Sequence, residues 1–220
     1  MKQINYLGKE NSIFNHFLAE IRDVEVQQDS MRFRRNLERL GEIFAYEISK
    51  TMEYEEREIN TPLGSTNMNL LKEKPVLATI LRAGLPLHQG LLNYFDDSNN
   101  AFISAFRKPH RDGSFEIQID YLSAPNLEDK TLILADPMIA TGQSIVLSYK
   151  ELLTNGQPKH THFVSVIASS EGLEYLQSEL SPHNCSLWIG AVDDELTAQS
   201  YIVPGLGDAG DLAYGAKLDE

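Results

Sequence analysis

Residues 131–144 read TLILADPMIATGQS, an apolar run followed by an acidic residue and a loop of small and hydroxyl-bearing residues. Residues 131–135 predict a buried strand, and Thr141, Gly142 and Ser144 open the next helix. Backbone N–H groups at such a helix start bind a dianionic phosphate, and the two hydroxyls add donors. Asp136 cannot bind that phosphate, but it can accept hydrogen bonds from ribose hydroxyls. The pattern favours a ribose 5-phosphate site over an ordinary turn capped by Thr141 or Ser144.

Short apolar strands alternate with helical stretches from about residue 75 onward, which indicates a parallel sheet covered by helices on both faces. Before it, apolar residues at helical spacing predict helices over 12–22 and 30–52, the second with Ser30 as its N-cap. The expected fold class is α/β, with a doubly wound core, a helical N-terminal region and a single domain spanning 1–220. The expected strands are 76–81, 101–106, 131–135, 162–168 and 186–191, and the expected helices among them are 86–94, 144–153 and 171–180.

One segment of this region differs from the buried strands. Residues 115–121 (FEIQIDY) alternate strictly between apolar and polar side chains, directly after Asp112-Gly113. A D-G pair followed by alternation is typical of a hairpin. We therefore expect a protruding, half-exposed β-hairpin.

The composition limits the classes of partner. The chain has 19 Lys+Arg against 32 Asp+Glu, a formal net charge of −13, which disfavours nucleic acid and anionic membranes as partners. Cys185 is the only cysteine, so an internal disulfide and a multi-cysteine zinc site are excluded. With no apolar run of signal-peptide or membrane-span length, the expected location is the cytoplasm.

A second loop, Leu81-Arg82-Ala83-Gly84, ends the strand predicted over 76–81. It sets a fixed cation beside a flexible backbone that can turn its amides toward an anion. The alternative is a surface arginine followed by a turn glycine.

A third loop, residues 205–210 (GLGDAG), spells the dinucleotide pattern G-x-G-x-x-G. That fingerprint requires a following helix and an acidic residue about 20 positions further on, and only ten residues follow Gly210. We therefore expect no helix after it and no dinucleotide. Its glycines would let backbone N–H and C=O groups match a pyrimidine edge; the alternative is a glycine-rich tail without a ligand. Together the three loops suggest a sugar-phosphate donor that reacts with a base.

With these motifs the chain resembles the uracil phosphoribosyltransferases of the type I phosphoribosyltransferase fold. The resemblance runs from about residue 21 to 214, through residues 60–63 (NTPL), 80–84 (ILRAG), 136–144 (DPMIATGQS) and 201–211 (YIVPGLGDAGD). It implies transfer of ribose 5-phosphate from phosphoribosyl pyrophosphate (PRPP) to N1 of uracil, giving UMP and pyrophosphate. It also implies Mg²⁺ bound mainly through PRPP, with no metal site made by the protein, and a homodimer or higher homo-oligomer. Some members respond to GTP.

The resemblance assigns roles residue by residue. Asp208, Arg82 and Arg107 would be catalytic: Asp208 would face the reacting sugar, Arg82 would meet the pyrophosphate, and Arg107 would be the second arginine that binds PRPP. Uracil would be bound at Ile202, Gly207, Asp208 and Ala209. PRPP would be bound by Arg82, Ala83, Gly84, Arg107, Asp136, Pro137, Met138, Ile139, Ala140, Thr141, Gly142, Gln143, Ser144 and Asp208.

Two stretches depart from the family pattern. Residues 108–111 (KPHR) are basic where the family usually has acidic residues, and Leu212 stands where it typically has an arginine. The alternatives are therefore a phosphoribosyltransferase for another base and a non-catalytic PRPP- or nucleotide-binding regulator.

Four further features favour structural roles. His160 and His162 form an H-x-H pattern that can bind metal, but an exposed strand edge is the preferred interpretation. Residues 193–195 (DDE) predict a solvated acidic turn, although Asp193 matches a family position near the uracil loop. Cys185 is expected in the core, and the stripe Phe33, Leu37, Leu40 and Phe44 is expected in the core or at a subunit interface.

Overall fold

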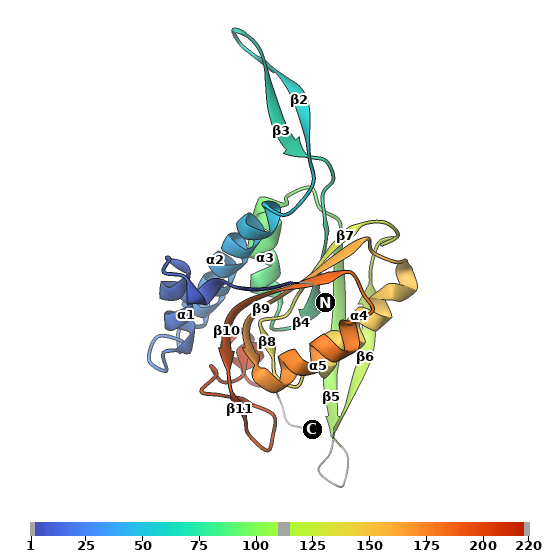
Figure 1. Cartoon of the computed structure of the whole chain (residues 1–220). Coiled ribbons are helices and arrows are strands. Elements are labelled where there is room, and N and C mark those ends of the chain that lie inside the picture. The colour runs from blue at the N-terminus through green and yellow to red at the C-terminus, as the bar shows by residue number, and fades with distance from the viewer. Residues whose placement is uncertain (1–2, 110–114, 218–220) are drawn as a thin grey trace.

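The computed structural model describes residues 3–109 and 115–217, and for 3, 106–109 and 115–117 it describes the backbone alone. A twisted, mainly parallel sheet runs through the molecule in the order β1-β10-β9-β7-β4-β5-β6, with β8 paired to β9 (Figure 1). The strands of this sheet are β1 (Gln3–Tyr6), β4 (Val76–Leu81), β5 (Asn100–Pro109), β6 (Phe115–Ser123), β7 (Thr131–Ala135), β8 (Met138–Ile139), β9 (His160–Ser169) and β10 (Cys185–Asp193).

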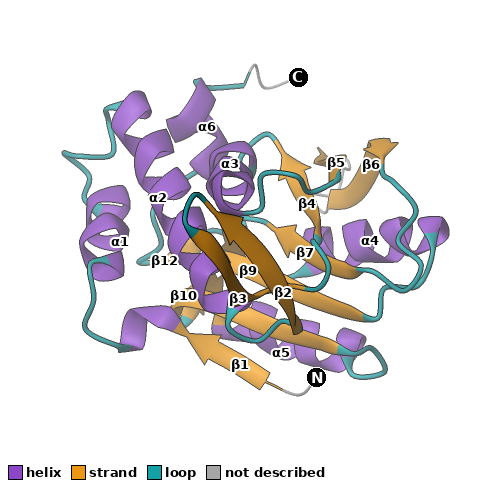
Figure 2. Ribbon diagram, turned by 90° about the horizontal axis from the view of Figure 1, so that it is seen from above, coloured by secondary structure: helices purple, strands orange, loops and turns teal. Residues whose placement is uncertain are grey.

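Helices cover both faces of the sheet, as the apolar strands require (Figure 2). One face packs against α1 (Phe14–Arg22), α2 (Ser30–Ser49) and α3 (Leu85–Tyr94), and the other against α4 (Gln143–Leu152) and α5 (Ser170–Leu180). Phe33, Leu37, Leu40 and Phe44 are buried, which confirms the predicted core stripe of α2. Among the described residues, no helix has both the length and the apolar character needed to cross a bilayer.

The predicted strands and helices of the core are confirmed, with ends that shift by no more than three residues. The N-cap prediction for α2 is wrong by one position. Asp29 caps the helix, because its carboxylate accepts hydrogen bonds from the N–H groups of Met31 and Arg32 at 3.0 Å each. Ser30 is the first residue of the helix, which ends at Ser49 and not at Met52.

A long hairpin that the sequence analysis missed projects from the body (Figure 1). It consists of β2 (Tyr54–Thr61) and β3 (Gly64–Leu71), whose side chains are almost all exposed. Because neither face of this hairpin packs on the core, its sequence lacks the apolar alternation that predicts a half-buried strand. We call this hairpin the arm.

The predicted strand 115–121 is confirmed as β6, which runs antiparallel to β5 at the edge of the sheet. The D-G turn before it lies outside the described residues. The interpretation of His160 and His162 as an exposed strand edge is wrong, because β9 lies between β7 and β10. His162 is only 5% exposed.

The order of the strands decides where a ligand can bind. From β4 the chain passes to β5 and β6 on one side, and then to β7 on the other side of β4. In open α/β sheets, ligands bind beyond the carboxyl ends of the strands at such a reversal. Arg82 directly follows β4 and Asp136 directly follows β7, so both leave the sheet at this reversal.

Candidate active site

The loop between β7 and α4, predicted to bind a phosphate, has a conformation set by strand pairing and by a glycine cap. Asp136 donates its N–H to the carbonyl of Val164, which continues the ladder between β7 and β9 by one residue. Gly142 then takes the left-handed conformation, with φ +79°, and serves as the N-cap of α4. The alternative in which Thr141 or Ser144 caps the helix is thus wrong. A small hollow of about 50 Å³ lies in this loop, lined by Asp136, Met138, Ile139, Ala140, Thr141, Gly142, Ser144 and Ile145.

The start of α5 supports this loop from behind. The Ser169 hydroxyl donates to the Ala140 carbonyl at 2.5 Å and accepts the Gly172 N–H at 2.8 Å. A Cβ on Gly172 would lie 2.2 Å from the Ala140 oxygen, so only glycine permits this approach. The loop conformation is therefore held by residues about 30 positions away in the chain.

Asp136 has an unusual protonation equilibrium. Part of the residue reaches the surface, but burial of its carboxyl raises the pKa to about 7, against a weaker opposite effect of a hydrogen bond from the Met138 backbone. Near neutral pH this group therefore exists in both protonation states.

The Arg82 loop is tied to the Asp136 loop through adjacent strands. The Thr79 hydroxyl of β4 donates to the Ala135 carbonyl of β7 at 3.1 Å. Gly84 packs directly above, because a Cβ there would lie 2.0 Å from Thr79 Oγ1 and 3.3 Å from the Ala135 oxygen. This contact fixes where the Arg82 backbone turns into α3.

Gly84→Ala is expected to destabilise the fold and to loosen the Arg82 loop. The added methyl group overlaps Thr79 and the Ile80 carbonyl, and overpacking of this kind costs about 1–3 kcal/mol. Chemical denaturation and a PRPP titration measure the two effects. Gln89→Ala, an exposed change on the same helix, is the control and should alter neither. Unchanged stability and PRPP affinity in Gly84→Ala would contradict the tight contact.

The loop predicted to bind uracil follows β12 (Ile202–Val203), which pairs with β11 (Glu195–Leu196). Gly205 and Gly207 take positive φ values of +57° and +92°, so the chain turns sharply twice within three residues. Gly205 is buried, whereas Gly207 is exposed. Ile202 and Ala209 pack in the core, and each residue is 4% exposed.

An ion pair that the sequence analysis did not find holds this turn. Arg22, at the end of α1, donates to both carboxylate oxygens of Asp193, with its shortest contact at 2.6 Å. Asp193 in turn accepts the Gly205 N–H at 2.9 Å, and Arg22 also reaches the Gly205 carbonyl at 3.4 Å. The prediction of a solvated turn is therefore wrong for Asp193, which is only 8% exposed.

The expectation that no helix follows Gly210 is wrong. α6 (Ala209–Tyr214) begins inside the glycine pattern, with Asp208 as its N-cap. The Asp208 carboxylate accepts the Asp211 N–H at 2.9 Å and lies 3.3 Å from Lys217 Nζ. Burial would raise the Asp208 pKa, but these two partners outweigh it and lower the pKa below its ordinary value. Asp208 is therefore ionised at neutral pH.

Tertiary folding brings the Arg82 loop against α6. Arg82 donates to the Asp211 carboxylate at 3.2 Å and to the Gly215 carbonyl at 3.3 Å. The predicted pyrophosphate-binding cation and the predicted uracil loop thus adjoin each other, although they are about 130 residues apart in the chain.

For Arg107 and the basic residues that follow it, the structure gives less detail than for the other predicted positions. Arg107 lies on β5, with its backbone opposite Ile117, and its side chain is outside the described set. The basic residues 108–111 likewise have no described side chains. Leu212 is half-buried, packs on the core, and its Cδ1 lies 3.8 Å from where a Gly207 Cβ would stand. Leu212 therefore packs beneath the loop predicted to bind uracil, on the side that faces the core.

The family model of uracil phosphoribosyltransferase matches residues 9–216 of this chain. The chain belongs to the uracil phosphoribosyltransferase family. A uracil phosphoribosyltransferase from Porphyromonas gingivalis is 53% identical over 216 residues, covering 98% of this chain and 100% of the relative. One from Thermococcus gammatolerans is 39% identical, covering 97% of this chain and 94% of the relative.

A solved structure shares the overall fold of this chain. The structure of AQ2163 protein from Aquifex aeolicus superposes with a TM-score of 0.86 and 30% sequence identity, covering 99% of this chain and 100% of that one. As a uracil phosphoribosyltransferase family member, the chain has the expected type I phosphoribosyltransferase fold, with its mainly parallel sheet and helices on both faces.

Proposed function

We propose that this chain transfers ribose 5-phosphate from PRPP to N1 of uracil, releasing pyrophosphate and forming UMP. The observation that carries the proposal is the contact of Arg82 with Asp211 and Gly215, which sets the Arg82 loop against the predicted uracil loop. The Asp136 loop lies at the neighbouring strand end. A phosphate cradle, a cation for the leaving group and a backbone edge for the base thus surround one region, as a transfer between two bound substrates requires.

In the proposed mechanism the protein forms no covalent bond with the sugar. The 136–144 loop holds the 5′-phosphate through N–H groups and hydroxyls, and Asp136 accepts hydrogen bonds from ribose hydroxyls. Backbone atoms of Ile202, Gly207 and Ala209 orient the uracil edge. As the bond to pyrophosphate breaks, positive charge develops on the ribose and negative charge on the leaving group, and Asp208 and Arg82 stabilise the two charges.

Mg²⁺ fits this site as an ion carried by PRPP. Among the described residues, no group of three or more His, Cys, Asp or Glu side chains gathers as a metal cage. Mg²⁺ commonly binds through substrate phosphates and one or two carboxylates, and the ionised Asp208 is the carboxylate we assign to it. The ion would neutralise charge on the leaving pyrophosphate.

PRPP affinity is expected to fall as the pH drops from 8 to 6. Ribose hydroxyls donate to the ionised Asp136, so binding favours the carboxylate, whereas in the free protein the pKa is about 7. Protonation before binding then weakens affinity by about tenfold over this range. Because folding raises the pKa of Asp136 above its ordinary value, the protonated side chain stabilises the fold. This contribution to the free energy of unfolding is full below about pH 4 and is lost as the pH rises through 7.

Isothermal titration of PRPP at several pH values measures the change, with Asp136→Asn as the matched variant. PRPP has its own phosphate titration near pH 6, which both proteins share. Equal pH dependence in the wild type and in Asp136→Asn would contradict the role given to Asp136.

One assay tests the proposed activity against its alternatives. Purified protein is incubated with Mg²⁺, PRPP and labelled uracil, with other bases in parallel, and UMP and pyrophosphate are quantified. Equimolar UMP and pyrophosphate from uracil are expected. If product forms only with another base, that base is the substrate. PRPP binding without any product would favour a non-catalytic regulator. GTP is added in a further arm as an effector.

We also propose a homo-oligomer and a cytoplasmic location. The projecting arm supports the first, because Leu63 at its tip is fully exposed and Met68 is 53% exposed, apolar surface that a second subunit would cover. Light scattering of the intact chain and of Leu63→Ser and Met68→Ser variants tests this. The phosphorylated sugar substrate, PRPP, supports the proposed cytoplasmic location.

A further inference from the structure

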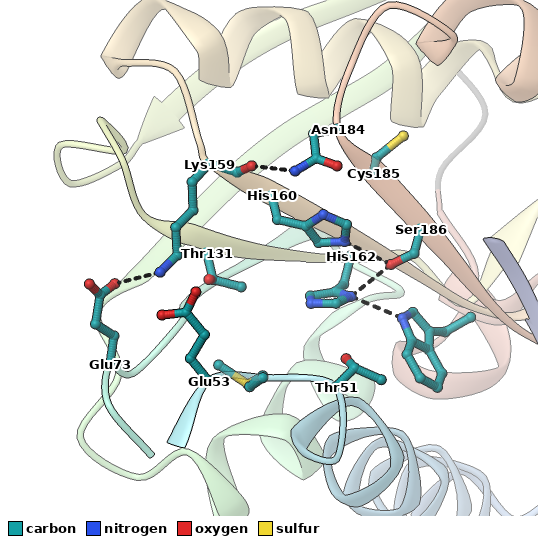
Figure 3. A pocket seen from close by; sticks show the side chains of 12 residues that line it. Thr51, Glu53, Glu73, Thr131, Lys159, His160, His162, Asn184, Cys185 and Ser186 are labelled. Carbon is teal, nitrogen blue, oxygen red and sulfur yellow. Dashed lines mark hydrogen bonds and ion pairs between the residues drawn. The ribbon is translucent and has the colours of Figure 1, made fainter. Parts of the chain in front are cut away.

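A large cavity lies at the opposite edge of the sheet from the proposed active site. It measures about 550 Å³, within the range of small-molecule sites, and opens at the amino ends of β7, β9 and β10 (Figure 3). The C-terminal end of α2 and the base of the arm border its other side. Because these strands are parallel, their amino ends are separated from Arg82 and Asp136 by the length of the sheet.

Polar side chains line this cavity at strand positions that elsewhere face the core. Along β9, His160 and His162 share a face with Val164 and Val166, which are buried against the helices. On β10, Ser186 and Trp188 occupy the neighbouring positions of the same face. α2 ends at Ser49, before it could cover them, so a hollow replaces core packing here.

A hydrogen-bond network fixes the histidines. Ser186 Oγ lies 3.0 Å from His160 Nε2 and 2.8 Å from His162 Nδ1, and Trp188 donates its indole N–H to the same Nδ1 at 3.0 Å. Since an indole can only donate, His162 Nδ1 accepts and the ring proton sits on Nε2. Burial, with a smaller effect of His160, lowers the His162 pKa to about 3, so the ring is neutral. In Figure 3, Nε2 makes no bond to the residues drawn.

The opposite wall supplies carboxylate acceptors. Glu53, exposed at the base of the arm, forms an ion pair with Lys72 at 3.4 Å, and Glu73 forms one with Lys159 at 3.2 Å. Because each lysine is already paired with a carboxylate, the described residues of this wall include no unpaired lysine to attract an anionic ligand. Met52 and the Trp188 ring add apolar surface to the lining.

From this arrangement we infer a second ligand site, for an uncharged, amino-bearing aromatic heterocycle of nucleobase to nucleoside size. A ring nitrogen or carbonyl would accept from His162 Nε2–H, an amino group would donate to Glu53, and a flat face would lie against Met52. Trp188 would sense the ligand through its hydrogen bond to His162. A phosphorylated ligand would meet Glu53 and Glu73. The inference stands apart from the proposed transfer reaction, since none of these residues belongs to that site.

Trp188 makes the inference directly measurable, because it is the only tryptophan in the chain and lines the cavity. Tryptophan emission of the full chain is titrated with adenine, adenosine, AMP and ribose. We expect a saturable change with adenine and adenosine, at least tenfold weaker binding of AMP, and no change with ribose. The same titrations with UMP saturating the active site should give unchanged affinities.

Variants locate the binding. Glu53→Ala removes the acceptor at an exposed position and should weaken adenosine binding at least tenfold, whereas Glu58→Ala, an exposed change further along the arm, should not. His162→Phe tests the donor, but Glu53→Ala decides the matter if that variant misfolds. Tryptophan emission that no probe changes would overturn the inference. This result is expected if a second copy of the chain closes the cavity. Displacement of adenosine by UMP, or equal affinity in Glu53→Ala, would also overturn the inference.

Discussion

Asp208→Asn is expected to lower kcat by about 10²–10³-fold with little change in stability. The carboxylate would face positive charge that develops on the ribose only in the transition state, so its removal weakens binding of the transition state more than binding of the substrates, with a smaller loss of affinity for Mg²⁺-bound PRPP. Asparagine has nearly the same shape and still caps α6 by accepting the Asp211 N–H. The loss should therefore appear in kcat, with KM for uracil and the melting temperature nearly unchanged.

Steady-state kinetics and thermal unfolding separate these effects. Asp194→Asn is the matched control, because Asp194 is an exposed acid that bonds to Ser170 and lies outside the proposed site. Its kcat should stay at the wild-type value. Full activity in Asp208→Asn would refute the role given to this carboxylate, and an equal loss in both variants would point to a nonspecific effect of charge.

Arg22→Ala is expected to raise KM for uracil about tenfold or more and to lower unfolding free energy by roughly 2–4 kcal/mol. The change leaves the Asp193 side chain, 7% exposed, without its cationic partner and frees the Gly205 carbonyl. Gly205 anchors the turn that presents Gly207 and Asp208. A displaced turn misplaces the atoms proposed to bind the base, while the 136–144 loop keeps its own supports. PRPP affinity should therefore change little.

Denaturant unfolding and titration of both substrates test this prediction, with Asp193→Asn and the double variant completing a thermodynamic cycle. Arg32→Ala is the control, since Arg32 forms an exposed ion pair with Glu20 on the neighbouring helix. Such pairs contribute about 1 kcal/mol or less, and uracil affinity should not change. Additive effects of Arg22→Ala and Asp193→Asn would contradict a coupled support of the turn.

The local sequence pattern was sufficient to predict the strands and helices of the core. The run 131–144 predicted a buried strand, an acidic residue at its end and a helix start, and the structure contains each of them. Strands β4 and β7 even have the predicted limits. Such features follow from side-chain periodicity and from glycine or hydroxyl residues within a few positions, which is information that a short window of sequence holds.

Reasoning from sequence pattern failed for elements whose burial or exposure is not reflected in their apolar and polar periodicity. The arm is exposed on both faces, so no apolar alternation marked β2 and β3. α6 is a single short helix in a glycine-rich segment, and its start depends on the Asp208 cap. The histidines of β9 resembled an edge because they are polar, yet neighbouring strands flank β9 on both sides.

By itself, the sequence determined the residue chemistry of each loop: the acid, glycine and hydroxyl groups at 136–144, the cation at Arg82 and the glycine turn at 205–210. Only the tertiary structure decided how these loops meet. Arg82 reaches Asp211, and Arg22 reaches Asp193, across separations of more than a hundred residues. The hollow beside His162 likewise exists because α2 stops short of the sheet's end. Hydrogen-bond chemistry is a property of single residues and their neighbours, whereas proximity across the chain depends on strand order and on where each helix ends.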